Sequence, residues 1–382
     1  MKKIIEHLGG DKTIWVLVII LSVISLLAVY SSTGTLAYKY HGGHTEFYLL
    51  KHLSILIFGL GLMYVAHIVP YKYYSRIAQI LIYISIPLLL ITLITGTNLN
   101  EASRWLTLPV INLSFQTSDM AKLALIMYVA RLLSKKQSEI KDLKSAFVPI
   151  MLPILLTVGL ILPANFSTAA VLFATSLVIL FIGRINLKYI FSLIGIGIFG
   201  FLILLLIAKS NPNVLPRLET WISRLESFSD KDAEGNYQAD QAKIAIATGN
   251  LFGKMPGNSV QRNYLPHPYS DFIFAIIVEE YGLFGATGVI LLYLILLYRS
   301  VRIASNSPGT FGAFLSIGLA FSLVFQAMIN MMVAVNLLPV TGQPLPLISM
   351  GGTSIWFTSI SIGIILSVSR ESTEKIQDHA TA

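Results

Sequence analysis

Long apolar runs separated by short polar segments dominate the chain. A helix needs about twenty predominantly apolar residues to cross a bilayer, and such a helix satisfies its backbone hydrogen bonds internally. The pattern therefore predicts an all-α polytopic membrane protein with ten transmembrane helices in a single integral membrane domain covering 1–382. The predicted spans are 13–32, 48–68, 77–96, 116–134, 146–163, 168–184, 188–208, 272–298, 310–334 and 351–369.

Composition supports the same class. The chain is 55% hydrophobic and 12% charged, whereas soluble domains carry roughly 25% charged residues. It contains no cysteine, which excludes disulfides, zinc–thiolate sites and cysteine nucleophiles. The net charge of +8 does not indicate nucleic acid as a partner, because the basic residues lie in short loops between apolar runs.

The distribution of basic residues predicts the orientation of the chain. Sixteen lysines and arginines fall in segments on the side of the N-terminus, against three in the short segments on the other side. Positive residues concentrate in cytoplasmic loops, so both termini are expected in the cytoplasm and the first run is read as an uncleaved first span. The three residues in the short outer segments are Lys39, Lys51 and Arg104.

The segment 209–270 is then a large extracytoplasmic loop between the seventh and eighth spans. It is far longer than a connector, and loops of this length are usually functional or disordered. Its apolar residues from 215 to 228, including Trp221, would form a stripe along one face of a helix. The charged residues, including Arg224, fall mostly outside this stripe. We expect an amphipathic surface helix there and a second short helix at 238–250.

Asp271 lies where this polar loop meets the apolar run of the eighth span. One interpretation is structural, because Ser270 or Asp271 before an apolar helix is good N-cap chemistry. The other is a carboxylate held at the membrane edge within reach of a lipid-linked substrate. The two are compatible. Glu279 and Glu280 are expected deeper in the same helix, where neither can pair directly with Asp271.

A second group opens the fourth span. Ser118, Asp119 and Lys122 stand at its start, and Asp119 and Lys122 are three residues apart, so they can share a helix face. The structural interpretation is an ion pair inside the bundle. The functional one is that Lys122, or Arg104 in the preceding outer loop, offers positive charge to a pyrophosphate.

The segment 336–356 is rich in proline and glycine, which predicts irregular, re-entrant backbone or a tight turn into the last helix. The segment 162–169 is either a hairpin between two spans or part of a cavity wall. The seven histidines show no ligand spacing, and His267 is assigned to packing. The sequence has no P-loop, GxSxG or HExxH motif.

Four ordered stretches resemble the SEDS family of bacterial membrane proteins (shape, elongation, division and sporulation), represented by RodA and FtsW. They are SRWLTLP at 103–109, FQTSDMAKLALIMYVA at 115–130, GNSVQRNYLPHPYSDFIFAIIVEEYG at 257–282 and PVTGQPLPLISMGGTS at 339–354. The resemblance covers essentially the whole chain. The third stretch is more similar to the FtsW division branch than to the RodA elongation branch.

The resemblance implies a peptidoglycan glycosyltransferase that polymerises lipid II in the bacterial inner membrane at the division septum. It also implies a class B penicillin-binding protein and other division proteins as partners, and Mg or Mn as a divalent cation. Asp271 corresponds to the family's essential aspartate, and Asp119 and Lys122 to its acidic residue and lysine. Further substrate-binding residues are expected within the matching stretches, namely Arg104, Ser118, Gln261, Arg262 and Ser349.

The chain departs from the family pattern at two places. Thr117-Ser118-Asp119 replaces Pro-Ser-Glu, so the carboxylate is one methylene shorter. Ala164-Asn165-Phe166-Ser167 replaces Pro-Asp-Phe-Gly, and Asn165 cannot act as a general acid or base.

The resulting hypothesis assigns Asp271 as general base for the acceptor hydroxyl, with Arg104, Lys122 and Arg262 as cations for the departing pyrophosphate. The sequence has no metal-binding cluster, so the metal is an inference from the family alone. Two alternatives remain open, a flippase or transporter of lipid-linked precursors and a non-catalytic division scaffold.

Overall fold

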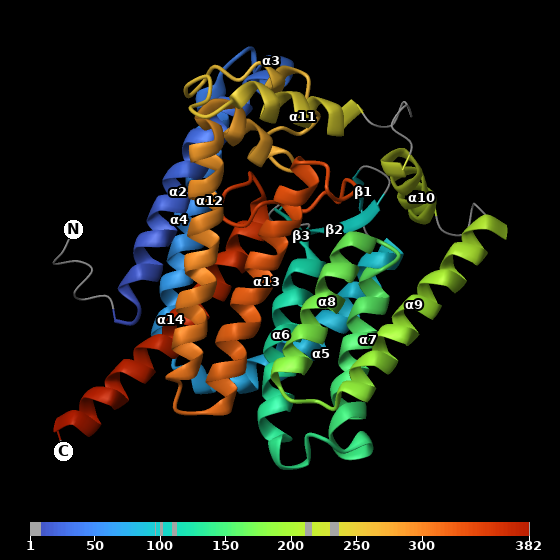
Figure 1. Cartoon of the computed structure of the whole chain (residues 1–382), viewed down its shortest axis with the longest axis vertical. Helices are drawn as coiled ribbons and strands as arrows, with labels where there is room; N and C mark the ends of the chain where they lie inside the picture. Colours follow the sequence, from blue (N-terminus) through green and yellow to red (C-terminus); the bar gives the residue numbers. More distant parts are fainter. Residues whose placement is uncertain are drawn as a thin grey trace.

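The computed structural model describes residues 9–95, 97–99, 102–108, 113–210, 216–229 and 237–381. Most helices run side by side along the long axis of the molecule, and α9 is inclined away from the others at one edge (Figure 1). The helices are α2 (Lys12–Ser32), α3 (Gly34–His41), α4 (Thr45–Ile68), α5 (Tyr71–Thr95), α6 (Thr117–Lys135), α7 (Val148–Ile161), α8 (Phe166–Ile182), α9 (Leu187–Ser210), α10 (Pro216–Ser229), α11 (Tyr237–Gly249), α12 (Ile273–Ser305), α13 (Thr310–Ala334) and α14 (Gly352–Thr381).

Each of the ten predicted spans coincides with one helix, namely α2, α4 to α9 and α12 to α14. Within the described residues, seven helical segments are long and apolar enough to cross a membrane, and α8 and α9 each contain a shorter apolar helix. The tenth, α6, opens with the polar residues Asp119 and Lys122, which lowers its hydropathy. The prediction of a helical membrane protein with ten spans is confirmed.

A small antiparallel sheet is an addition to the predicted all-α fold. Strands β1 (Thr97–Leu99), β2 (Ala102–Leu108) and β3 (Leu113–Gln116) pair in that order between α5 and α6. The register places Trp105 opposite Gln116, the last residue before α6. The helical periodicity used for the prediction does not reveal short strands in a loop.

The two ends of the bundle differ. We call the end that holds α3, α11 and the loop between α11 and α12 the loop end, and the end that holds the start of α2 and the turn between α12 and α13 the terminal end (Figure 1). Helix α2 begins at the terminal end, where Asp11 accepts hydrogen bonds from the backbone N–H of Thr13 and Ile14 and so caps the helix. The two helices predicted in the large loop are present as α10 and α11.

Helix α12 contains a reversal at Gly282. This residue has φ 64° and ψ −162°, a backbone conformation essentially restricted to glycine. The preceding section, Ile273–Tyr281, is buried along nearly its whole length, and only the section after Gly282 has the exposed apolar side chains of a membrane span. The eighth predicted span is therefore two helical sections joined by a sharp bend.

The bend reverses the expected depth of the two glutamates. Ser31, at the loop end of α2, donates a hydrogen bond to Glu280. The section Ile273–Tyr281 consequently runs toward the loop end, and Glu279 and Glu280 lie nearer that end than Asp271 does. The expectation that they lie deeper than Asp271 was wrong, because a helix with no break was assumed.

The segment between α13 and α14 re-enters the bundle. Ser25 donates to the carbonyl of Ile348 over 2.8 Å, and Tyr293 donates to the carbonyl of Pro346 over 2.5 Å. Ser25 lies seven residues before the end of α2, which at 1.5 Å per residue is about 10 Å inside the loop end. The predicted re-entrant backbone is confirmed.

Candidate active site

A cavity of about 480 Å³ lies where the re-entrant segment, the 250–270 loop and the start of α6 meet. Its wall combines polar side chains with exposed backbone from elements distant in sequence. It is lined by Gln116, Asp119, Lys122, Asn165, Arg224, Gln238, Pro266, His267, Tyr269, Ser270, Asp271, Val340, Thr341, Gly342, Gln343, Pro344, Met350, Gly351, Gly352 and Ser354. Non-helical backbone at this depth is tolerated in membrane proteins where it lines such a cavity.

The backbone around Asp271 is fixed by three contacts from α13 and the re-entrant segment. Asn330 Nδ2 donates to the carbonyl of Asp271 over 2.9 Å. Ser349 Oγ donates to the carbonyl of Ser270 over 2.6 Å, and the N–H of Met350 donates to the carbonyl of Tyr269 over 2.9 Å. The partly exposed carboxylate of Asp271 accepts a hydrogen bond from Ser270 Oγ over 2.8 Å.

The N-cap interpretation of Asp271 is not supported. Helix α12 begins at Ile273, its cap residue is Phe272, and no side chain caps its first turn. The carboxylate therefore remains directed to the cavity instead of to the helix N–H groups.

The negative charge of Asp271 affects the hydroxyl of Tyr269 in the same cavity wall. Burial, followed by the neighbouring Asp271 carboxylate, raises the pKa of the Tyr269 hydroxyl above its usual value. Tyr269 OH lies 3.0 Å from Nδ1 of His267, so His267 also belongs to the cavity wall and not to the core. Its assignment to packing was wrong.

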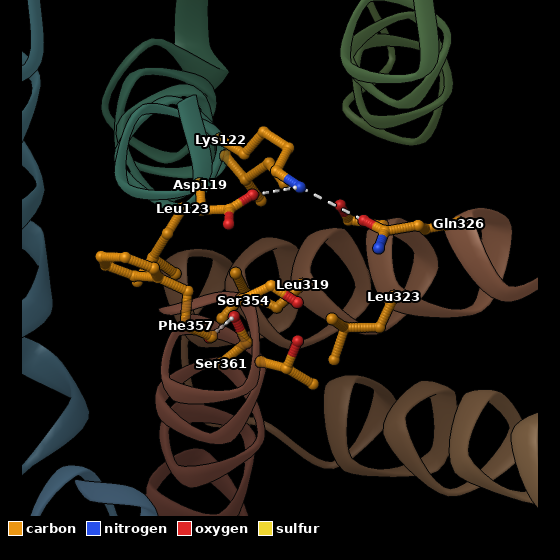
Figure 2. Close-up of a pocket in the computed structure, with 12 residues that line it drawn as sticks. Asp119, Lys122, Leu123, Leu319, Leu323, Gln326, Ser354, Phe357 and Ser361 are labelled. Atoms are coloured by element: carbon orange, nitrogen blue, oxygen red, sulfur yellow. Dashed lines mark hydrogen bonds and ion pairs between the residues drawn. The ribbon is translucent and has the colours of Figure 1, made fainter. Parts of the chain in front are cut away.

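Asp119 and Lys122 form the predicted ion pair, with 2.9 Å between Lys122 Nζ and Asp119 Oδ1. Figure 2 shows Lys122 reaching from α6 to Gln326 of α13, whose Oε1 accepts from Nζ over 3.2 Å. Gln326 Nε2 in turn donates to the carbonyl of Pro344 over 2.9 Å. The lysine is thus held between a carboxylate and an amide that also fixes the re-entrant segment.

Below this pair, a smaller cavity of about 30 Å³ extends into the bundle. Hydroxyl groups of Ser354 and Ser361 line it together with Asp119 (Figure 2). Asp119 Oδ2 is buried and has no hydrogen-bond partner among the described residues. A space of this size is large enough for one water molecule, which would satisfy that oxygen.

Arg224 brings a second cation to the large cavity. It projects from α10 and donates from Nη1 to the carbonyl of Val340 over 2.9 Å. Trp221, one helical turn before Arg224 in α10, packs edge-on against Phe166 at the start of α8, with 4.3 Å between ring centroids. The helix is therefore anchored over the cavity by an aromatic contact and by an arginine that lines the wall.

Comparison with known proteins bears on what this cavity is for. The family model described as "Cell cycle protein" and labelled FtsW, RodA and SpoVE matches residues 11–374. The chain belongs to the FtsW/RodA/SpoVE family. The predicted resemblance to the SEDS family is thereby confirmed over nearly the entire chain.

Two relatives and one solved structure show the extent of the similarity. "Probable peptidoglycan glycosyltransferase FtsW" of Trichlorobacter lovleyi is 32% identical, with 94% of this chain and 93% of the relative covered. "Stage V sporulation protein E" of Bacillus subtilis is 33% identical, covering 95% and 97%. A chain of the solved structure described as "Structural coordination of polymerization and crosslinking by a peptidoglycan synthase complex" superposes with a TM-score of 0.70 at 26% identity, covering 96% and 99%.

Not every residue predicted at the site of this FtsW/RodA/SpoVE family member lines the cavity. Gln261 and Arg262 lie in the short helix Gln261–Asn263, and Arg262 Nη1 donates to the carbonyl of Ser31 over 3.0 Å. This contact holds Arg262 at the loop end of α2, so its predicted contact with a pyrophosphate is not supported. Gln261 is buried beside Glu279, because its backbone N–H donates to that carboxylate over 3.2 Å.

Ser118 and Ser349 do not line the cavity, but each makes a hydrogen bond to a residue that does. Ser118 Oγ accepts from Gln116 Nε2 over 2.9 Å and so orients a side chain of the cavity wall. Ser349 is buried and accepts from the N–H of Leu345 over 2.8 Å while it donates to Ser270. Arg104 lies in β2, and its side chain is outside the described residues.

Glu279 organises the loop that precedes Asp271. Its carboxylate is fully buried and accepts from Lys254 Nζ over 2.7 Å and from Ser259 Oγ over 2.5 Å. The backbone N–H groups of Val260 and Gln261 also donate to it, each over 3.2 Å. The ion pair of Lys254 with Glu279 and the hydrogen bonds to this carboxylate fix residues 254–261 at the loop end.

Buried amide side chains, which the sequence did not predict, link the walls of the cavity. Asn330 also donates to the carbonyl of Gln343 over 2.7 Å, and Gln343 Nε2 donates to Thr168 Oγ1 over 2.8 Å. Gln326 and Asn330 are four residues apart in a largely apolar helix, a signal that two amide groups share one face of α13. Asn165 accepts from the N–H of Thr168 and lines the cavity, so the segment 162–169 is part of the wall.

Proposed function

We propose that this family member is a peptidoglycan glycosyltransferase that polymerises lipid II, with Asp271 as the general base. The observation that carries the proposal is the cavity wall, which presents the Asp271 carboxylate together with the cations Lys122 and Arg224. A base and positive charges in one cavity are the groups that glycosyl transfer from a pyrophosphate requires. The Trichlorobacter lovleyi relative, named a probable peptidoglycan glycosyltransferase, supports the same activity.

In the proposed reaction, the 4-hydroxyl oxygen of the acceptor sugar attacks the anomeric carbon of the donor. Asp271 takes the hydroxyl proton as the new carbon–oxygen bond forms. The bond between the anomeric carbon and the pyrophosphate oxygen breaks, and the lipid pyrophosphate leaves with the bonding electron pair. Asp271 suits this role because its backbone is held on both sides, through Asn330 and Ser349, while its carboxylate faces the cavity.

Lys122 and Arg224 are assigned to the pyrophosphate. Lys122 already neutralises Asp119, so its charge is shared and the pair is net neutral before substrate arrives. Arg224 comes from α10, the amphipathic helix over the cavity, and supplies the positive charge that was first assigned to Arg262. Arg104 remains a proposed contact in β2.

A divalent cation, Mg or Mn, is retained as a proposed cofactor. The chain offers oxygen ligands there, the carboxylates of Asp271 and Asp119, which suit hard cations. Among the described residues, no three His, Cys, Asp or Glu side chains are placed so that they could hold a metal ion together. Most ligands would therefore come from substrate phosphates and water. Such an ion would neutralise charge on the leaving pyrophosphate.

We further propose a class B penicillin-binding protein and other division proteins as partners. The superposed solved structure is that of a peptidoglycan synthase complex described as coordinating polymerization and crosslinking, which supports a transpeptidase partner. The proposed location is the bacterial inner membrane at the division septum, with both termini in the cytoplasm and the loop end outside. The relatives include both an FtsW and a sporulation protein, and the 257–282 motif favours the division role.

The test is polymerisation of lipid II by the purified full-length protein, with its class B partner and a divalent cation present. Wild type should give a ladder of glycan strands, and Asp271→Ala should lower the rate by at least about 100-fold, the range for loss of a general base. Asp240→Ala is the matched control, because Asp240 is an exposed acid on α11 that pairs with Lys243.

Normal polymerisation by a folded Asp271→Ala variant would contradict the role of Asp271. Absence of product from wild type would instead favour one of the alternatives. A lipid II flipping assay would then separate a transporter, which moves the lipid, from a scaffold, which does not.

A further inference from the structure

A second cavity, of about 410 Å³, lies at the terminal end of the bundle and shares no lining residue with the cavity that holds Asp271. It is bounded by the start of α2, the last turns of α12 and the second half of α14, and it is lined by Lys12, Arg299 and Arg302. Ser369 and Thr373 of α14 and Asn306 add hydroxyl and amide groups. The proposed glycosyl transfer uses none of these residues.

The charge of this cavity is positive. Arg299 is the fixed member, since its Nε and Nη2 donate to Asp11 Oδ2 over 2.8 and 2.6 Å. Asp11 is also engaged as the cap of α2, so one acid is balanced by one arginine. Lys12 and Arg302 are both exposed, and they leave the cavity with an excess of two positive charges.

The faces that carry these two residues continue as apolar stripes. Residues four, seven and eleven positions apart lie within about 40° on a helix. From Lys12 they are Val16, Ile19 and Val23, and from Arg302 they are Tyr298, Ile295 and Leu291. All six side chains are exposed apolar residues of membrane-spanning helices.

Cationic groups at the ends of two helices, each followed by an exposed apolar stripe, match the two halves of an anionic phospholipid. We propose that the terminal-end cavity binds the phosphate of an anionic phospholipid, with Lys12 and Arg302 contacting the headgroup and the stripes contacting the acyl chains. Basic pockets between transmembrane helices are a recurrent way of holding such headgroups. The stripes favour a lipid over a soluble phosphate, because they open to the hydrocarbon and not to water.

A phospholipid bound in this cavity would contact the ends of α2 and α12 and the second half of α14 at the same time. Asp11 and Arg299 already join α2 to α12 at this cavity, and a phosphate between Lys12 and Arg302 would add a second link. Both links are electrostatic and lie at the end of the bundle opposite the reversal at Gly282.

The test is retention of lipid by detergent-purified full-length protein, read by native mass spectrometry. The probes are phosphatidylglycerol and phosphatidylcholine with identical acyl chains, added in equal amounts. Wild type should retain phosphatidylglycerol preferentially. The variant Lys12→Ala/Arg302→Ala should retain it about 30-fold more weakly, as expected for two basic residues at an anionic headgroup.

The control variant Lys72→Ala/Lys135→Ala removes two exposed basic residues outside the cavity and should behave as wild type. Equal retention of the two lipids by wild type would overturn the proposal, as would equal losses in the two variants. Displacement of phosphatidylglycerol by inorganic phosphate would assign the cavity to free anions and would also overturn it. The readout is binding, so failure of the glycosyltransferase proposal leaves this result unaffected.

Discussion

At the residue scale, the site depends on side chains that hold other groups in place. Gln326 and Asn330 of α13 donate to backbone carbonyls of the re-entrant segment and of Asp271, and Lys122 completes the chain of contacts to Asp119. Buried carbonyls that lose their donor cost roughly 1–3 kcal/mol each. These contacts therefore contribute both to stability and to the position of the base.

Replacement of Asn330 by Ala removes the donor to Asp271 and to Gln343. We expect the polymerisation rate to fall about 10-fold or more, with little change in KM, because the base moves while the substrate cavity stays. Steady-state kinetics on lipid II would measure both. Met328→Ala, an exposed residue on the same helix, should leave the rate near wild type.

Replacement of Lys122 by Met leaves Asp119 as an unpaired buried acid. Breaking a buried pair by removing one partner typically costs about 3–5 kcal/mol, so thermal unfolding in detergent should shift to a clearly lower temperature. The double variant Asp119→Leu/Lys122→Met should regain most of the stability but not the activity. A double variant as unstable as Lys122→Met would show that the destabilisation does not come from an isolated charge.

At the element scale, the reversal at Gly282 decides where α12 places its groups. A Cβ at Gly282 would lie 2.3 Å from the carbonyl oxygen of Leu251 and 2.5 Å from the N–H nitrogen of Gly253. Both are backbone atoms, so neither can move away cheaply. The bend therefore depends on the absence of a side chain at this position and on its positive φ.

Gly282→Ala should destabilise the protein by about 3 kcal/mol or more, the sum of backbone strain and steric overlap. Gly288→Ala is a matched control in the same helix, because a Cβ there meets nothing within 4 Å. It should be neutral or stabilising by up to about 1 kcal/mol. Similar melting temperatures for the two variants would contradict the bend.

These elements differ in how far the sequence predicts them. Periodicity located all ten spans and both loop helices, because each buries one face or spans the bilayer over many residues. It did not reveal the bend, since Ile273–Tyr281 and the span after it read as one apolar run. Motifs located Asp271 and Lys122, but Arg224 and Asn330 required knowledge of which elements meet in space.

At the scale of the whole molecule, the cysteine-free chain allows a direct test of orientation. Asn258 at the loop end and Ser138 near the end of α6 are both exposed. A membrane-impermeant maleimide should label Asn258→Cys in intact cells and Ser138→Cys only after the membrane is opened. The reverse pattern would invert the proposed topology and place the cavity on the cytoplasmic side.

The bend at Gly282 also has a consequence for how the protein is made. Ile273–Tyr281 has nine residues, about 13 Å of helix, and cannot cross a hydrocarbon core of about 30 Å as a span of its own. It must settle into the bundle after the section that follows it has been inserted. The groups that hold Asp271, namely Asn330, Ser349 and Met350, all come from chain that is synthesised later still. A nascent chain released before residues 330–350 emerge would thus contain Asp271 without the residues that fix it, and catalytic competence would arrive only after that segment has been made.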